Sequence, residues 1–312
     1  MITIQNQNFG VEIELTGITR EQGAKVISEY FHGTSIGHLS DGYDTWTAKD
    51  RKGRTWKCSR DISIRPETRS NGRTNQLSEG RTRSDHRCEV VTPILQYEDL
   101  EDLQEIVRKL REAGAIANNS CGIHVHVDGA NHTPDSLTRL VNFAVGRQDL
   151  FYEALEIGDR GDRWCKKINQ NLLQAMRKDN VRTRESMEHI WYSAVNDGYR
   201  GGIDHTHYNS TRYHGINLHA FFTKGTVEFR LFNGTTHAGK IKAYVQFCLA
   251  MSAWAINAKD NLHFMKSANY TDKAQRGKLM LAVLKNRLGM RGPEYKTARL
   301  HLTAAFTEQA AA

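Results

Sequence analysis

The chain has 312 residues, with 43 Lys and Arg against 35 Asp and Glu, so its formal net charge is +8 at pH 7. Hydrophobic residues make up 39% and charged residues 25%, which is typical of a folded globular protein and excludes a largely disordered chain. No stretch approaches the ~20 apolar residues of a membrane span, and the N-terminus lacks the basic and apolar regions of a secretory signal.

Alternation of apolar and polar residues predicts several strands, and helical spacing predicts helices between them. In chain order, the predicted strands are 9–15, 61–64, 89–95, 123–128 and 226–232, with a further short strand around 216–221. The predicted helices cover 97–114, 133–157, much of 160–197, and 240–258, which is apolar almost all round. The C-terminal segment, about 260–312, is expected to form two amphipathic helices and a frayed tail.

The stretch 65–87 differs from the rest in composition. It contains six arginines and only one large aliphatic residue, Leu77. It cannot bury enough apolar surface to fold alone, so we expect a long mobile loop between two strands. It is either a solvated insertion or an arginine-rich flap that captures an anionic ligand, such as an acidic substrate.

Charged side chains and imidazoles share one face of the predicted strands. Residues two apart in a strand face the same way, which pairs Glu12 with Glu14, Asp61 with Ser63, His124 with His126, and Glu228 with Arg230. If the strands are neighbours, one surface gathers Glu12, Glu14, Asp61, Glu89, His124 and Glu228.

Carboxylates at such close range repel one another unless cations neutralise them. Oxygen ligands with one imidazole suit Mg²⁺ or Mn²⁺. Taken alone, a Glu-x-Glu pair usually lies on the solvated face of a strand, and a His-x-His pair is usually structural or binds zinc. Their joint occurrence on strands of the same kind predicts a metal site. The five cysteines form no CxxC pair. This favours reduced thiols in a cytoplasmic location, and it argues against a disulfide framework or a structural zinc site.

Five blocks of sequence resemble the amidoligase family, which belongs with the carboxylate–amine ligases of glutamine-synthetase type, alongside glutamate–cysteine ligases. The blocks follow the family's order: 9–15, 56–63, 89–95, 121–127, and Arg212-Tyr213 with Asn217 leading into 226–230. The resemblance covers roughly residues 8–255 and leaves out the C-terminal helices.

The resemblance implies an α+β fold with a curved, mainly antiparallel sheet that forms a glutamine-synthetase-like catalytic funnel flanked by helices. It implies a catalytic domain over residues 1–258, with the arginine-rich insertion at about 65–87. A helical C-terminal extension would cover 259–312.

The resemblance also implies a role for each matching residue. Two or three Mg²⁺ (or Mn²⁺) ions would be bound by Glu12, Glu14, Glu89, His124 and Glu228, with Asp61 and Ser63 as further candidates. His126 would lie beside the nucleotide or the transferred phosphoryl group, and Arg230 would stabilise that group. Arg212, Tyr213 and Asn217 would line the nucleotide and substrate pocket.

The implied activity is an ATP-dependent ligase that forms an amide or isopeptide bond. The γ-phosphoryl group of ATP would activate a carboxylate as an acyl phosphate, which an amine then attacks. The metals and Arg230 would offset phosphate charge. Both substrates stay open, as does a small-molecule, peptide or protein product. Neither a membrane nor nucleic acid is an expected partner, and an oligomer is possible.

Two other functions fit parts of the sequence. A metal-dependent hydrolase could use the same imidazoles and carboxylates to activate water, although hydrolysis does not require an arginine facing phosphate, such as Arg230. A nucleic-acid-binding protein would agree with the net charge of +8 and the basic insertion. Against it, the chain shows no helix-turn-helix or RNP motif, and its clearest strands are acidic.

Overall fold

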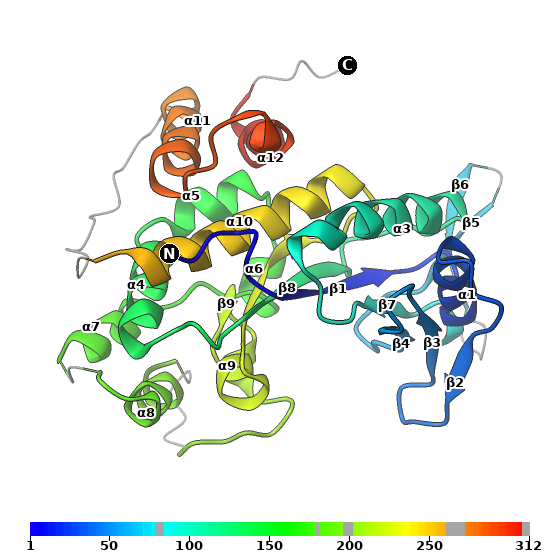
Figure 1. Cartoon of the computed structure of the whole chain (residues 1–312), viewed down its shortest axis with the longest axis horizontal. Coiled ribbons are helices and arrows are strands. Elements are labelled where there is room, and N and C mark those ends of the chain that lie inside the picture. The colour runs from blue at the N-terminus through cyan, green and yellow to red at the C-terminus, as the bar shows by residue number, and fades with distance from the viewer. Residues whose placement is uncertain (71, 79–83, 179–180, 196–201, 260–271, 308–312) are drawn as a thin grey trace. The chain divides into compact units, whose positions relative to one another are not determined.

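A computed structural model describes the chain except residues 71, 79–83, 179–180, 196–201, 260–271 and 308–312 (Figure 1). The chain divides into two compact units. The first unit comprises Asn8–Val125 and Phe232–Lys242, and the second comprises Met1–Gln7, His126–Leu231 and Ala243–Ala312. The predicted boundary at residue 258 stays a prediction, and the C-terminal helices belong to the second unit.

The architecture is α+β, with an eight-stranded sheet in the order β2-β3-β4-β7-β1-β8-β10-β9. The sheet is antiparallel and not closed, and helices flank it. Its strands are β1 (Phe9–Leu15), β2 (Gly37–Leu39), β3 (Thr45–Lys49), β4 (Thr55–Ser59), β7 (Cys88–Val91), β8 (Gly122–Asp128), β9 (Ile216–Asn217) and β10 (Thr226–Asn233). The predicted fold class is confirmed.

The alternation in β1 and β8 separates an apolar face from a polar one. Its apolar members are almost fully buried: Val11, Ile13, Leu15, Ile123, Val125 and Val127. Burial of one such face fixes strand register, because a slip of one residue would turn every side chain over. The carboxylates and imidazoles of these strands are therefore held on the opposite face.

The helices of the first unit are α1 (Arg20–Tyr30) and α3 (Leu100–Glu112), which follows the short 3₁₀ turn η1 (Tyr97–Asp99). A capping box between Thr19 and Gln22 starts α1. The apolar stripe of α3 is buried and consists of Leu100, Leu103, Ile106, Val107 and Leu110. α1 packs against both β3 and α3, so these helices cover the sheet locally (Figure 1).

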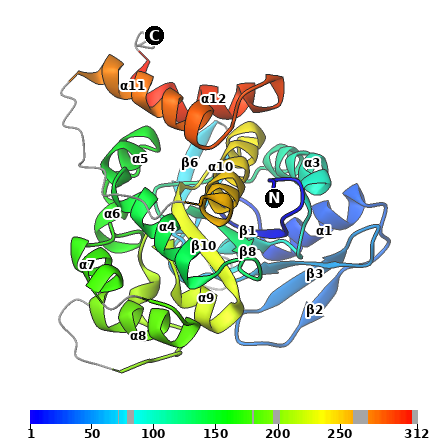
Figure 2. The ribbon, with the colours of Figure 1, turned by 60° about the vertical axis from the view of Figure 1, so that its left-hand side comes forward.

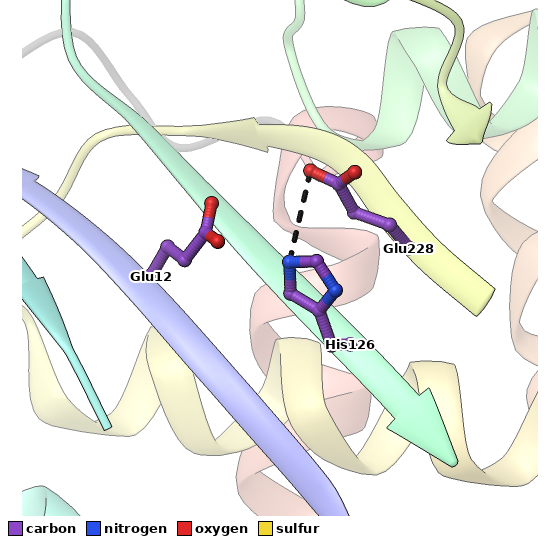
Figure 3. Close-up of side chains that lie close together, drawn as sticks. All are labelled: Glu12, His126 and Glu228. Atoms are coloured by element: carbon purple, nitrogen blue, oxygen red, sulfur yellow. Dashed lines mark ion pairs between the residues drawn. The ribbon is translucent and has the colours of Figure 1, made fainter. Parts of the chain in front are cut away.

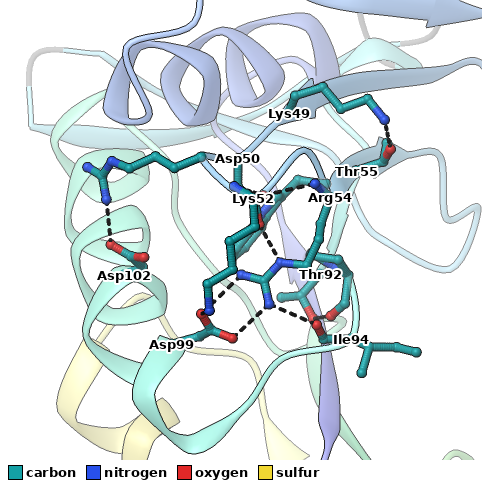
Figure 4. A network of polar contacts seen from close by, with 12 residues as sticks. Lys49, Asp50, Lys52, Arg54, Thr55, Thr92, Ile94, Asp99 and Asp102 are labelled. Carbon is teal, nitrogen blue, oxygen red and sulfur yellow. Dashed lines mark hydrogen bonds and ion pairs between the residues drawn. The ribbon is translucent and has the colours of Figure 1, made fainter.

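An ionic clamp joins the turn between β3 and β4 to the start of α3 (Figure 4). Arg54 donates to both oxygens of Asp99, at 2.7 and 3.0 Å, and its Nε lies 2.7 Å from Asp50 Oδ2. Lys52 Nζ lies 2.9 Å from Asp99 Oδ1. Burial opposes ionisation of Asp99, but hydrogen bonds from Arg54, the Gln96 backbone and Lys52 hold its pKa well below the usual range.

The second unit is mainly helical and includes the short 3₁₀ turn η2 (Ser210–Arg212). Its helices are α4 (Pro134–Val145), α5 (Gln148–Ala154), α6 (Arg160–Arg163), α7 (Gln170–Lys178), α8 (Arg184–Ala194), α9 (His219–Lys224), α11 (Lys273–Ala282) and α12 (Lys296–Thr303). α10 (Ala238–Asn257) begins in the first unit and continues into the second, and it matches the predicted buried helix. α7 packs against α8, and α11 against α12 (Figure 2). No helix in the described ranges is long and apolar enough to cross a bilayer.

The predicted strand over 61–64 is wrong. These residues form a turn after β4, in which the Ser63 backbone N–H donates to Asp61 Oδ1 at 2.7 Å. Ile62 is 70% exposed, so the alternation does not mark a buried face. An aspartate that bonds the backbone two residues on is typical of an Asx turn. The strand predicted over 89–95 is real but ends at Val91, two residues before Pro93.

Two predictions for the second unit also need correction. The helix predicted over 133–157 is broken around Gly146 into α4 and α5, whereas the prediction that much of 160–197 is helical is confirmed by α6, α7 and α8. The strand predicted around 216–221 is limited to β9, because α9 starts at His219. α9 ends at Lys224, and the next residue, Gly225, caps it with a positive φ of 77°. Glycine adopts that conformation without strain.

Part of the stretch predicted as a loop, 65–87, is ordered as a hairpin. β5 (Glu67–Ser70) pairs antiparallel with β6 (Arg73–Gln76). The Thr16 hydroxyl and the Gly17 N–H donate to Glu67 O, each at 2.9 Å, and fasten the hairpin to the end of β1. The prediction of a structureless loop is therefore wrong for this part. Residue 71 and residues 79–83 lie outside the described ranges.

Candidate active site

A cluster of carboxylates surrounds His124 in the first unit. Glu12 Oε2 lies 3.0 Å from His124 Nδ1, and Glu14 Oε1 lies 3.8 Å from His124 Nε2. The Gly122 N–H donates to Glu14 Oε2 at 2.6 Å. The side chains of His124 and Glu14 are only 3% and 5% exposed. β1 and β8 therefore hold three ionisable groups together in a largely buried place.

Glu89 and Asp61 complete this cluster from β7 and the turn after β4. Glu89 lies opposite Glu14 in the pairing of β1 with β7. One ligand atom each from Glu12, Glu89 and His124 lies within 4.8 Å of the others, and the same holds for Glu14, Asp61 and Glu89. We call these five residues the carboxylate cluster. Ser63 takes part through its backbone, by holding Asp61.

The carboxylate cluster carries four acidic groups and one imidazole. Like charges directly opposite each other on neighbouring strands, such as Glu14 and Glu89, destabilise a sheet. Multivalent cations remove that repulsion, and hard oxygen donors with one imidazole fit Mg²⁺ or Mn²⁺. None of the five is a cysteine, so the soft thiolate that favours structural zinc is missing from this set. The residues present therefore fit the predicted metal.

A second cluster lies in the second unit, around Glu228 of β10. His126 Nε2 is 3.8 Å from Glu228 Oε1, as the dashed line in Figure 3 shows, and His126 Nδ1 is 2.9 Å from the Thr226 hydroxyl. Arg230 Nη1 donates to Glu228 Oε1 at 2.5 Å, and Asn217 Nδ2 to Glu228 Oε2 at 2.5 Å. These five residues are the Glu228 cluster.

Glu228 and Arg230 form a buried ion pair in which each charge depends on the other. The side chains are 3% and 6% exposed, so each ion needs the other to offset the loss of hydration. Arg230 is held further by Nε, 3.3 Å from Trp164 O. The guanidinium is thus fixed in one orientation beside a buried carboxylate. Asn217 Oδ1 is buried without a hydrogen-bond partner among the described residues, which leaves one polar atom for a ligand.

Aromatic rings and guanidinium groups alternate next to Arg230. Its Cζ lies 5.9 Å from the centre of the Tyr213 ring, and that of Arg212 lies 5.7 Å from the same ring. The rings of Trp164 and Tyr213 pack edge to face, with centroids 5.5 Å apart. Arg212 is tied down by its bond to His207 O at 2.7 Å. Flat rings can stack on a nucleotide base, and guanidinium groups beside them can bond its phosphates.

The structure brings the predicted site residues together within each unit. Glu12, Glu14, Asp61, Glu89 and His124 form the carboxylate cluster. His126, Asn217, Glu228 and Arg230 form the other, with Arg212 and Tyr213 alongside. β8 contributes His124 to one and His126 to the other, two residues apart on one face. Convergence of Glu228 with the carboxylate cluster stays a prediction, as do the assigned roles.

Sequence reasoning missed three groups that position these side chains. Thr226 holds His126, and its place two residues before Glu228 could have indicated it. Gly122 gives its N–H to Glu14, which residue type cannot reveal, because any residue except proline has that donor. Trp164 gives its carbonyl to Arg230, and a contact between residues so far apart in the chain leaves no local pattern.

One protein family matches most of the chain. The model of a family described as putative amidoligase enzyme matches residues 5–252, which include every residue of both clusters. A search of curated proteins finds no match.

Proposed function

This chain belongs to the amidoligase family, and from that premise we propose that it is an ATP- and Mg²⁺-dependent carboxylate–amine ligase, with Mn²⁺ as an alternative metal. The family supports an amide-bond-forming ligase in general. The proposed reaction forms an amide or isopeptide bond through an acyl phosphate.

The observation that carries the proposal is the carboxylate cluster. Ligand atoms of Glu12, Glu89 and His124 lie within 4.8 Å of one another, as do those of Glu14, Asp61 and Glu89, on a face where ordinary strands carry neutral or mixed polar residues. Glu12, Glu14, Glu89 and His124 would hold the metal ions, with Asp61 beside them. Bound there, the ions would supply charge that offsets the phosphate oxygens of ATP.

The proposed chemistry needs ATP because an amine does not displace oxide from a carboxylate. The carboxylate oxygen attacks the γ-phosphorus, the bond to the β-phosphate oxygen breaks, and ADP leaves. The amine then attacks the acyl carbon, inorganic phosphate leaves, and the amine loses a proton. The protein has little covalent work to do: it positions three reactants and keeps water out.

Arg230 is the residue best suited to the moving phosphoryl group. Negative charge spreads over three oxygens of that group in the transition state, and a guanidinium can bond two of them at once. Glu228, Asn217 and the Trp164 carbonyl define where Arg230 lies, so it needs little reorganisation during the reaction. His126, held by Thr226, would donate to a phosphate oxygen nearby.

The direct test is ADP formation with Mg²⁺ against a panel of amino acids and acidic peptides. We expect ADP only when a suitable carboxylate and amine are both present. Glu12→Gln keeps the shape of the side chain and should abolish turnover. Glu101→Gln removes an exposed carboxylate of α3 and serves as the matched control. Turnover by Glu12→Gln at the parent rate would refute the metal assignment.

Product analysis separates the ligase from a hydrolase. Mass spectrometry should find a product that is the sum of the two substrates less one water, with one ADP and one phosphate for each bond. Mg²⁺ with ATP should also raise the melting temperature, whereas Zn²⁺ should not. Cleavage of a supplied amide by the Zn²⁺-loaded protein, without ATP, would favour the hydrolase.

A further inference from the structure

A basic pocket lies in the C-terminal part of the second unit, outside the stretch that the family model matches. After α11 the chain makes a π-helical turn, η3 (Val283–Arg287), and a short 3₁₀ turn, η4 (Pro293–Tyr295), before α12 begins. Between η3 and the start of α12 is a pocket of about 430 Å³. Its polar lining consists of Lys285, Asn286, Arg291, Lys296 and Arg299.

The pocket has positive charge without compensation. Four of its lining residues are cations, and none is acidic. In the part of the chain that the structure describes, none of these four forms an ion pair with a carboxylate. The neighbouring Glu294 is engaged elsewhere, where its Oε1 accepts from Gln246 Nε2 of α10 at 2.9 Å. Four like charges around one hollow repel each other and attract an anion.

Two of the cations are held in place by backbone carbonyls around the pocket and by the side chain of Asn286. Arg291 donates Nε to Lys285 O at 2.9 Å and Nη2 to Asn286 Oδ1 at 2.7 Å. Arg299 Nη1 donates to the carbonyls of Met290, Arg291 and Gly292 at 2.9–3.0 Å. Fixed guanidinium groups lose little entropy when they bind an anion.

We propose that this pocket binds the diphosphate or triphosphate group of a small molecule. Guanidinium and ammonium groups form charge-assisted bonds to phosphate oxygens, and four cations match the charge of about −3 to −4 on a triphosphate at neutral pH. The volume is in the range of small-molecule sites. A nucleic acid would need a stripe of cations along a surface, whereas these four line a single open pocket.

The test is calorimetric titration of the full chain with inorganic triphosphate, in about 0.15 M salt to screen diffuse attraction and with EDTA to remove divalent metal. Lys285→Gln with Lys296→Gln is the informative variant, because neither ammonium makes a described hydrogen bond that the fold would lose. Lys273→Gln with Lys278→Gln removes the same charge from exposed positions of α11 and is the matched control.

We expect one triphosphate per chain, with affinity reduced roughly tenfold or more in the pocket variant. The control variant and Arg230→Lys should bind like the parent, which separates this pocket from the proposed nucleotide site. If both double variants lost the same affinity for triphosphate, the effect would depend on net charge alone, and the proposal would be overturned. Loss in Arg230→Lys alone would overturn it too, as would binding of an oligonucleotide but not of triphosphate.

Discussion

Glu12 and His124 lie beside each other on neighbouring strands, with Glu12 Oε2 3.0 Å from His124 Nδ1. A carboxylate at Nδ1 favours the tautomer whose proton is on that nitrogen, which directs the lone pair of the imidazole to Nε2. Nε2 is the atom that lies nearest to Glu14. Carboxylates orient metal-binding histidines in this way, so Glu12 would position His124 for the proposed metal in addition to offering an oxygen ligand of its own.

Metal binding should depend on the carboxylate cluster without any nucleotide. We expect Glu89→Gln to weaken Mn²⁺ binding about tenfold or more, since it removes an anionic oxygen that two triads share. Titration of free Mn²⁺ by electron paramagnetic resonance measures this directly. Glu101→Gln should bind like the parent, and an unchanged affinity in Glu89→Gln would exclude that residue as a ligand.

Arg230→Lys should separate catalysis from folding. Lysine keeps the positive charge beside Glu228 but offers no fork of donors, so we expect turnover to fall roughly 100-fold while the melting temperature changes little. Steady-state ADP formation and thermal unfolding provide the two readings.

Arg230→Ala should behave differently, because Glu228 would stay buried without its cation. Removing one partner of a buried pair costs about 3–5 kcal/mol of unfolding free energy. If Arg230→Lys is unfolded to the same extent as Arg230→Ala, the effect of residue 230 is structural and the catalytic assignment fails.

The contribution of the Asp99 clamp to stability should depend on pH. Asp99→Asn leaves Arg54 with a weaker partner, and we expect a loss of about 3 kcal/mol near neutral pH. Because the folded pKa of Asp99 is depressed, its contribution is complete above about pH 4 and is lost as pH falls through the folded value. The difference between the variant and the parent in urea unfolding should therefore shrink toward pH 3.

The neighbouring Glu98 gives the matched control for that clamp. Its side chain is 71% exposed and 3.3 Å from Lys52 Nζ. Exposed ion pairs contribute little to stability, so Glu98→Gln should change the unfolding free energy by less than about 1 kcal/mol. Equal losses from Glu98→Gln and Asp99→Asn would refute the clamp.

His132 should make the protein less stable in mild acid. It is buried between the hydroxyls of Ser136 and Ser252, each 3.0 Å away, and burial, with the charge of Arg139, lowers its pKa to about 4. The unfolded chain takes up a proton near pH 6.5, so stability is complete above that value and falls as pH drops toward 4.

That difference in pKa corresponds to a loss of about 2 kcal/mol between pH 7 and pH 5. His132→Asn cannot be protonated and should lose correspondingly less between these two pH values in urea unfolding, whatever its stability at pH 7. If the unfolding free energies of the parent and the variant changed in parallel with pH, this account would fail.

Local patterns were enough to predict the parts of the fold where one face of an element is buried. β1, β8, β10 and α3 follow from apolar spacing alone, because burial imposes the period of the element on the sequence. The same pattern misled at Asp61–Ile64, where the aspartate bonds the backbone of Ser63 and makes a turn. Over so short a stretch, alternation and turn chemistry look alike.

The candidate site was predictable in its residue types but not in its contacts. Alternation places Glu228 and Arg230 on one face, yet their ion pair and the bond from Asn217 depend on how β9 pairs with β10. Pairing of distant strands has no local signature. The order of β1 between β7 and β8, which assembles the carboxylate cluster, was likewise open until the structure placed the strands.

The helices that follow the family-matched stretch determine where the chain can be shortened. Met280, Leu284, Met290, Ala298 and Leu302 have no exposed surface, and α11 packs against α5. A protein cut at residue 252 would therefore expose an apolar face of α5 and tend to precipitate. Substrate screens on this protein should use a polypeptide that extends at least through Phe306, even though the stretch that the family model matches ends some fifty residues earlier.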